Sequence, residues 1–158
     1  MSLHTGQSAG TSTGDLSARQ MAGLRRATLA SFALLVVQYA IGTGVNLYVG
    51  APSGVHGFGD AISKGPAALS VHVVLGLLLV LAAVGLVVQA VIARHWVLTA
   101  TSVVGLLALI AATLSGARFV EKGLPSASMA MAILTGVALL AYGANLYLLA
   151  SGRHRSGA

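Results

Sequence analysis

Four long runs of apolar residues constrain this chain more than any other feature of its sequence. They span residues 27–49, 67–92, 97–116 and 127–150 and contain no Asp, Glu, Lys or Arg. Each reaches the roughly 20 residues that an α-helix needs to cross a bilayer core of about 30 Å. Helices satisfy their own backbone hydrogen bonds there. The sequence therefore predicts an all-α polytopic membrane protein, an antiparallel up-down bundle of four transmembrane helices over residues 24–151.

Composition supports a bilayer as the solvent and excludes several classes of protein. Only 8% of the 158 residues are charged and 56% are hydrophobic, whereas a soluble domain has about 25% charged residues. The absence of cysteine excludes disulfides, iron–sulfur clusters and thiolate zinc sites. The net charge of +6 comes from residues near the ends of the apolar runs, where lipid headgroups and insertion topology favour them. We therefore expect lipid, and no nucleic acid, as the partner.

The distribution of basic residues predicts the orientation. Residues 1–23 are polar and rich in Ser, Thr and Gly, which is typical of a disordered tail. Six basic residues flank one side of the predicted bundle: Arg19, Arg25, Arg26, Arg94, Arg153 and Arg155. The other side has Lys64, Arg118 and Lys122, partly offset by Asp60 and Glu121. The positive-inside rule then places both termini in the cytoplasm, including a short tail at 152–158, and the glycine-rich loop 50–66 outside. The excess of Arg over Lys suggests a GC-rich bacterium, and hence its inner membrane.

Each predicted helix has a stripe of small or polar residues at helical spacing, the kind of face through which helices associate in lipid. The stripes comprise Ser31, Leu35, Gln38, Gly42 and Asn46; His72, Gly76, Leu79, Ala83 and Ala90; Ala108, Ala112 and Gly116; and Met129, Ala132, Gly136 and Gly143. We expect all four stripes to face the interior of the bundle. The related pentapeptides 44–48 and 143–147 (GVNLY and GANLY) are interpreted as interfacial Tyr anchors with Asn caps.

His72 is the natural centre of a candidate site, because it lies roughly 8 Å inside the external end of its helix and on an inward stripe. The other polar or sulfur-bearing residues expected at similar depth are Asn46, Thr113, Ser115, Ser128, Met129 and Met131, with Gln38 deeper. No carboxylate lies within the four runs. A hydrolytic enzyme or a proton-coupled transporter would need one to orient a histidine or carry protons. We therefore expect no catalytic residues.

Two interpretations of His72 remain open. In the first, it is a neutral structural histidine that bonds to Asn46, Ser115 or a backbone carbonyl and fixes helix register. In the second, it is an axial ligand of a b-type haem held between the helices, with Gly42, Gly76 and Gly136 giving clearance for the macrocycle.

A family resemblance bears on the second interpretation. The features that carry it are Gln38, the segment 42–44 (GTG), a glycine-rich loop with His56, and His72 early in the second run. Together they resemble one four-helix half of the haem A synthase family, over about residues 30–90. The resemblance implies that an inward histidine, here His72, ligates haem. Because the fourth run has no histidine, Met129 or Met131 would be the second axial ligand.

A copper site is a weaker alternative. Met129 and Met131 with His56 and His72 form a soft donor set. However, residues two apart on a helix point about 200° from each other, which is poor geometry for chelation. The sequence thus favours a small membrane protein with a structural or accessory role, in a larger complex or a homo-oligomer. The alternative is a haem b protein for electron transfer or haem handling.

Overall fold

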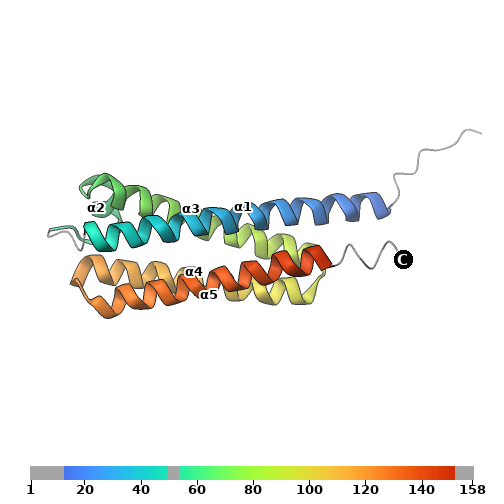
Figure 1. Cartoon of the computed structure of the whole chain (residues 1–158). Coiled ribbons are helices and arrows are strands. Elements are labelled where there is room, and N and C mark those ends of the chain that lie inside the picture. The colour runs from blue at the N-terminus through green and yellow to red at the C-terminus, as the bar shows by residue number, and fades with distance from the viewer. Residues whose placement is uncertain (1–12, 50–53, 152–158) are drawn as a thin grey trace, which may run out of the picture.

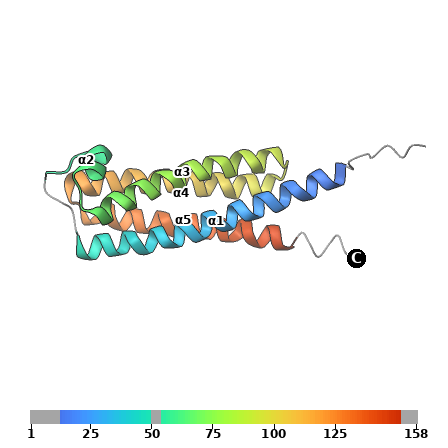
Figure 2. The same cartoon turned by 90° about the horizontal axis from the view of Figure 1, so that it is seen from above.

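The computed structural model describes residues 13–49 and 54–151, and every regular element in this part of the chain is a helix. The elements are α1 (Thr13–Tyr48), α2 (Gly57–Ser63), α3 (Ala67–Ile92), α4 (Trp96–Lys122) and α5 (Pro125–Ser151). The four long helices run up and down side by side (Figures 1 and 2). Each contains a segment long and apolar enough to cross a membrane. The predicted all-α bundle is confirmed, and the chain is a small multi-pass membrane protein.

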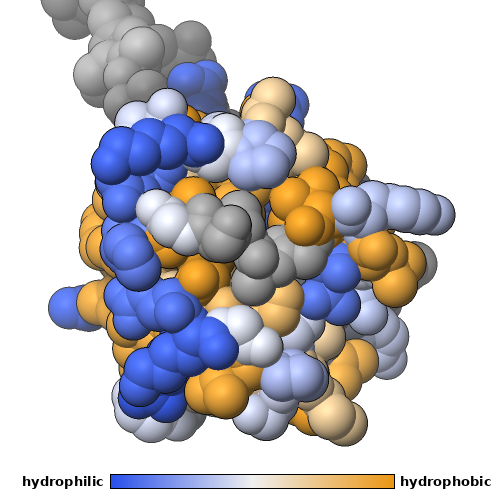
Figure 3. Space-filling model, turned by 90° about the vertical axis from the view of Figure 1, so that its left-hand side faces the viewer, coloured by the Kyte–Doolittle hydropathy of each residue, from blue (hydrophilic) through white to orange (hydrophobic). Residues whose placement is uncertain are grey.

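The helices surround a common core in the order α1, α3, α4, α5. Helix α1 packs against α3 and α5, α4 packs against the same two, and the interface of α4 with α5 is the most extensive. Helices α1 and α4 are therefore diagonal, as are α3 and α5. The start of α1 and the end of α5 lie at one end of the bundle, which we call the terminal end (Figure 1). Helix α2 lies at the opposite end, the α2 end, where hydrophilic residues gather among apolar ones (Figure 3).

Helix boundaries differ from the prediction at three places. Helix α1 has 36 residues and begins within the stretch expected to be disordered, so its first turns project past the bundle (Figure 2). Residues 1–12 and 152–158, the rest of the predicted tails, lie outside the described residues. Helix α4 continues beyond residue 116 and ends at Gly123, whose φ of 62° stops the helix in the left-handed conformation. The seven-residue α2 lies within the predicted loop.

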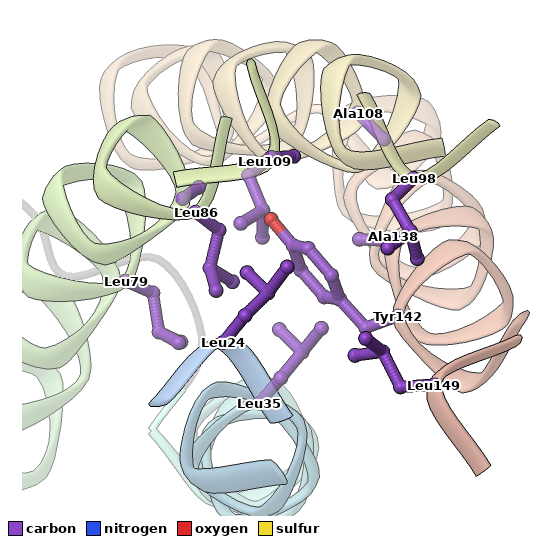
Figure 4. Close-up of a cluster of buried hydrophobic side chains, with 12 residues drawn as sticks. Leu24, Leu35, Leu79, Leu86, Leu98, Ala108, Leu109, Ala138, Tyr142 and Leu149 are labelled. Atoms are coloured by element: carbon purple, nitrogen blue, oxygen red, sulfur yellow. The ribbon is translucent and has the colours of Figure 1, made fainter. Parts of the chain in front are cut away.

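A tyrosine occupies the middle of the core. Tyr142 is 0% exposed and its ring points between the helices among Leu24, Leu35 and Leu109 (Figure 4). Gly105 of α4 makes room for it, because a Cβ added to Gly105 would lie 2.9 Å from Cζ of Tyr142. The Tyr142 hydroxyl is buried and has no hydrogen-bond partner among the described residues.

The predicted inward stripes are right for α3 and α4, wrong at one position of α1 and wrong at two positions of α5. Most of the stripe residues on α1, α3 and α4 are buried and the others on α3 and α4 are half-buried, but Asn46 near the end of α1 is exposed. On α5, Met129 is 67% exposed and Ala132 is also exposed, while Gly136 and Gly143 are half-buried. The buried residues of α5 are instead Ala127, Ala138, Ala141, Tyr142, Asn145 and Leu149. The physical reason is Tyr142: burying its large ring against Gly105 rotates the opposite face of α5 outward.

The two related asparagines pair helices rather than cap them, so their predicted role is wrong. Asn145 is 2% exposed; its Nδ2 donates to Ser102 Oγ at 2.9 Å, and its Oδ1 accepts from the Thr101 hydroxyl. This asparagine clamp joins α5 to α4 near the terminal end. At the α2 end, Ser128 Oγ of α5 donates to Asn46 Oδ1 of α1 at 2.8 Å.

Candidate functional site

A cavity of about 290 Å³ lies between the long helices toward the α2 end, and residues from all five helices line it. Most of the lining is apolar, including Leu35, Phe58, Leu79 and Leu109. The polar lining residues are Gln38, Tyr39, Thr43, Asn46, His72, Thr113, Ser128 and Thr135. None of the described residues that line the cavity is an Asp, Glu, Lys or Arg. The cavity is thus a weakly polar, uncharged compartment, with His72 as its titratable imidazole.

Two side chains pack reciprocally on two glycines beside the cavity. A Cβ added to Gly42 of α1 would lie 2.6 Å from His72 Cε1, and one added to Gly76 of α3 would lie 3.1 Å from Gln38 Nε2. Each helix therefore offers a polar side chain and, four residues later, a glycine that receives the partner's side chain. Gln38 Nε2 also donates to the backbone carbonyl of His72 at 2.7 Å. We call this arrangement the glycine interlock; it holds α1 and α3 in register.

The glycine interlock leaves two buried polar atoms without a hydrogen-bond partner in the described structure: Gln38 Oε1 and His72 Nδ1. The predicted partners of His72 are engaged elsewhere. Asn46 accepts a bond from Ser128, and the Ser115 hydroxyl bonds to the Ala111 carbonyl of its own helix. Leaving a buried polar atom unpaired costs about 1–3 kcal/mol. Both unpaired atoms belong to residues that line the cavity, although neither atom has accessible surface of its own.

The cavity brings together most of the predicted site. Gln38, Gly42, Asn46, His72 and Gly76 all line it. Prediction from sequence placed Asn46 and His72 at similar depth with Gln38 deeper, and put all five on inward stripes, because positions on α1 and α3 follow from residue spacing alone.

The sulfur ligands proposed for the site separate. Met131 lines the cavity from α5, on the far side of the bundle from α3. Met129 is 67% exposed and, like Ser115 and Gly136, does not line the cavity. His56 is exposed before α2 and also lies outside the lining. The structure therefore does not gather the four donors of the copper alternative.

Sequence reasoning missed several lining residues. Tyr39 and Thr43 follow Gln38 and Gly42 by one position each, so their spacing could have indicated a second lining face on α1. Phe58 comes from α2, a short element whose sequence, GFGDAIS, gives no periodic signal.

The residues available for a haem are His72 and Met131, on the diagonal helices α3 and α5. An imidazole and a thioether are a known axial pair. In the structure, however, His72 and Gln38 fill the space over Gly42 and Gly76. A macrocycle would use that clearance only if both side chains turned away from the glycines.

Comparison of the chain with protein-family models, with curated proteins and with solved structures finds no match in any of the three. The resemblance of residues 30–90 to the haem A synthase family thus stays an expectation from the residues themselves.

Proposed function

We propose that this protein is an accessory component of the bacterial inner membrane that binds a small uncharged molecule in the cavity and catalyses no reaction of its own. The observation that carries this proposal is the cavity of about 290 Å³, lined by Gln38 and His72, each with a buried polar atom that lacks a partner. Small-molecule sites are typically mostly apolar hollows with a few polar groups, and this cavity has that composition.

The chemistry of the lining supports binding rather than catalysis. A histidine that acts as a general base is normally oriented by a carboxylate or another acceptor on its second nitrogen. His72 Nδ1 has no such partner within the described part of the chain, and its ring is held instead by packing against Gly42. The groups that remain can recognise a ligand through hydrogen bonds.

Native mass spectrometry of the protein released from membranes tests the proposal. Thr113→Phe places a large ring in the cavity and breaks no bond to another helix, because the Thr113 hydroxyl bonds to Leu109 of its own helix. Leu114→Phe is the matched control, since Leu114 is 57% exposed on the outer face. We expect a small molecule to be released with the wild type and the control, and to be lost from Thr113→Phe. Equal retention by all three proteins, or no bound molecule in any, would contradict the proposal.

Haem b is the second candidate ligand, favoured by the presence of His72 and Met131 in one cavity. Protein purified from cells supplied with haem should then show a Soret band. His72→Ala should remove that band and His72→Gln should not restore it, because an amide is a poor axial ligand. The control is His95→Ala, at the exposed start of α4. A colourless wild type, or a haem-replete His72→Ala protein, ends this candidate.

For orientation, we propose that both termini are cytoplasmic, since Arg25, Arg26 and Arg94 lie at the terminal end and basic residues favour the cytoplasmic side. A fluorescent protein that folds only in the cytoplasm, fused to the C-terminus, should be bright. A phosphatase active only outside the cytoplasm should be inactive at the same position. The reverse pattern would overturn the orientation.

A further inference from the structure

A shallow, open apolar groove lies on the same seam of the bundle as the cavity. Its lining comes from α1 and α5 and is entirely apolar, including Phe32, Val36, Gly136, Val137, Leu140 and Gly143. We call it the seam groove. The cavity is lined by residues of the same two helices farther toward the α2 end, with Tyr39 and Thr43 on α1 and Ala132 and Thr135 on α5.

Two contacts fix how α1 and α5 face each other. Near the α2 end, Asn46 accepts a hydrogen bond from Ser128 at 2.8 Å. Toward the terminal end, a Cβ on Gly143 would lie 3.8 Å from Phe32. Moving back along α1 from residue 46 to 32 therefore corresponds to moving forward along α5 from 128 to 143. The cavity residues and the seam-groove residues occupy consecutive turns of this one antiparallel register, so the two hollows follow each other along the seam.

The mouth of the cavity opens on this seam. The exposed lining residues belong to α1, where Tyr39 is 44% and Leu47 is 68% exposed and the polar Thr43 and Asn46 are exposed as well, and to α5, where Ala132 is exposed. The described lining residues on α3 and α4 are all buried or half-buried. The seam lies on the flank of two candidate membrane-spanning helices, and we therefore place the mouth beside lipid.

The polar side chains of the cavity determine which kind of polar group a ligand can place there. Gln38 is only 7% exposed, and its Nε2 is engaged with the His72 carbonyl, so its unpaired Oε1 needs a donor. His72 Nδ1 can accept or donate, according to its tautomer. A hydroxyl both donates and accepts, so it can satisfy either atom once the side chain turns that atom toward the cavity. A charged group on the ligand would find no opposite charge among the described lining residues. Burying such a group unpaired would cost free energy.

We infer that the cavity and the seam groove together hold an uncharged lipid with a hydroxyl head group, which enters from the bilayer between α1 and α5. The hydroxyl lies in the cavity beside Gln38 and His72, and the hydrocarbon chain lies along the seam groove. This inference rests on the proposed function and assigns the class of ligand to the same cavity.

Photolabelling tests the inference. The full-length protein in phosphatidylcholine nanodiscs is irradiated with a long-chain alcohol that carries a diazirine on its chain, and labelled peptides are identified by mass spectrometry. Labels are expected on the α1 and α5 peptides that border the seam groove. An unlabelled long-chain alcohol should compete with the probe, whereas its methyl ether and the matching fatty acid at neutral pH should not.

A pair of leucine substitutions supplies the control. A Cβ on Gly136 would meet no atom within 4 Å, and the same is true of Gly85 on α3. Gly136→Leu therefore extends a side chain into the seam groove from an open Cβ position, and Gly85→Leu adds the same side chain from an open position elsewhere. We expect labelling to fall about tenfold in Gly136→Leu and to stay at the wild-type level in Gly85→Leu. Gly136→Ala, which adds only a methyl group, gives a smaller loss and serves if the leucine variant does not fold.

The outcomes separate this inference from the proposed function. Equal labelling of Gly136→Leu and Gly85→Leu overturns the lateral route, and equal competition by the methyl ether overturns the hydroxyl head group. If the probe does not label the seam while a co-purified molecule is still lost from Thr113→Phe, the inference fails and the proposed function stands. If Thr113→Phe retains the co-purified molecule, the proposed function itself fails.

Discussion

Replacing Gly42 by alanine tests the glycine interlock directly. The new methyl carbon would lie 2.6 Å from His72 Cε1, well inside van der Waals contact. His72 would have to turn away from α1, or the two helices would have to separate. The neighbouring Gly44 has nothing within 4 Å of its Cβ position, so Gly44→Ala makes the same chemical change one half-turn away with no clash.

The expected magnitudes follow from two opposing effects. Exchanging glycine for alanine within a helix stabilises it by about 1 kcal/mol. Overpacking a closed contact costs about 1–3 kcal/mol. Gly44→Ala should therefore raise the free energy of unfolding by about 1 kcal/mol, whereas Gly42→Ala should lower it by up to ~2 kcal/mol. In a His72→Ala background the clash is absent, and Gly42→Ala should become stabilising by about 1 kcal/mol.

A double-mutant cycle compares the wild type, Gly42→Ala, His72→Ala and the double variant. Reversible unfolding in mixed micelles, with helicity or the fluorescence of Trp96 as the signal, measures the free energy of unfolding of each. The coupling between positions 42 and 72 should be about 1–3 kcal/mol. If Gly42→Ala changes stability equally with and without His72, the two residues do not pack against each other and the interlock is refuted.

Three further predictions concern other parts of the bundle. Tyr142→Phe removes a buried hydroxyl that has no partner and should raise the free energy of unfolding by about 1–3 kcal/mol; unchanged or lower stability in the same micelle assay would show that the hydroxyl is paired. Asn145→Ala removes both bonds of the asparagine clamp and should cost about 1–2 kcal/mol, measured in the same way; a loss near zero would argue against the clamp. At the α2 end, hydrogen bonds from Lys64 and from the His56 amide lower the pKa of Asp60 below 3.8, so its contribution to stability is present above pH ~4 and lost as pH falls through the lowered pKa. Hydrogen exchange of the α2 amides should thus speed up below pH ~4 beyond its intrinsic pH dependence, and Asp60→Asn should remove that excess.

The sequence predicted the α1/α3 half of the site because its determinants are local. Gln38 with Gly42 and His72 with Gly76 are each four residues apart, so each pair must share a helix face. The structure shows that all four line one cavity. The bonding partners of His72 could not be obtained in this way, because they depend on how Asn46 and Ser128 align across two helices.

The rotation of α5 could not be obtained from its own sequence, since small residues occur on both of its faces. Ala132 and Gly136 form one face, and Ala138 and Ala141 form another. The choice between these faces depends on where Tyr142 finds room, and that room is the missing side chain of Gly105 on a different helix. Met129 was placed in the site through the same error, because it shares the face of Ala132 and Gly136.

Asn145 and Asn46 stabilise the two ends of the bundle to different degrees. Near the terminal end, Asn145 is buried in the most extensive helix interface, so separating α4 from α5 there breaks two bonds in a closed core. At the α2 end, the bond between Asn46 and Ser128 is exposed and competes with surrounding polar molecules. Spontaneous fluctuations of the helices should therefore be largest at the α2 tip and damped at the other. The seam between α1 and α5 should therefore open first at the α2 tip, while the rest of the bundle stays closed.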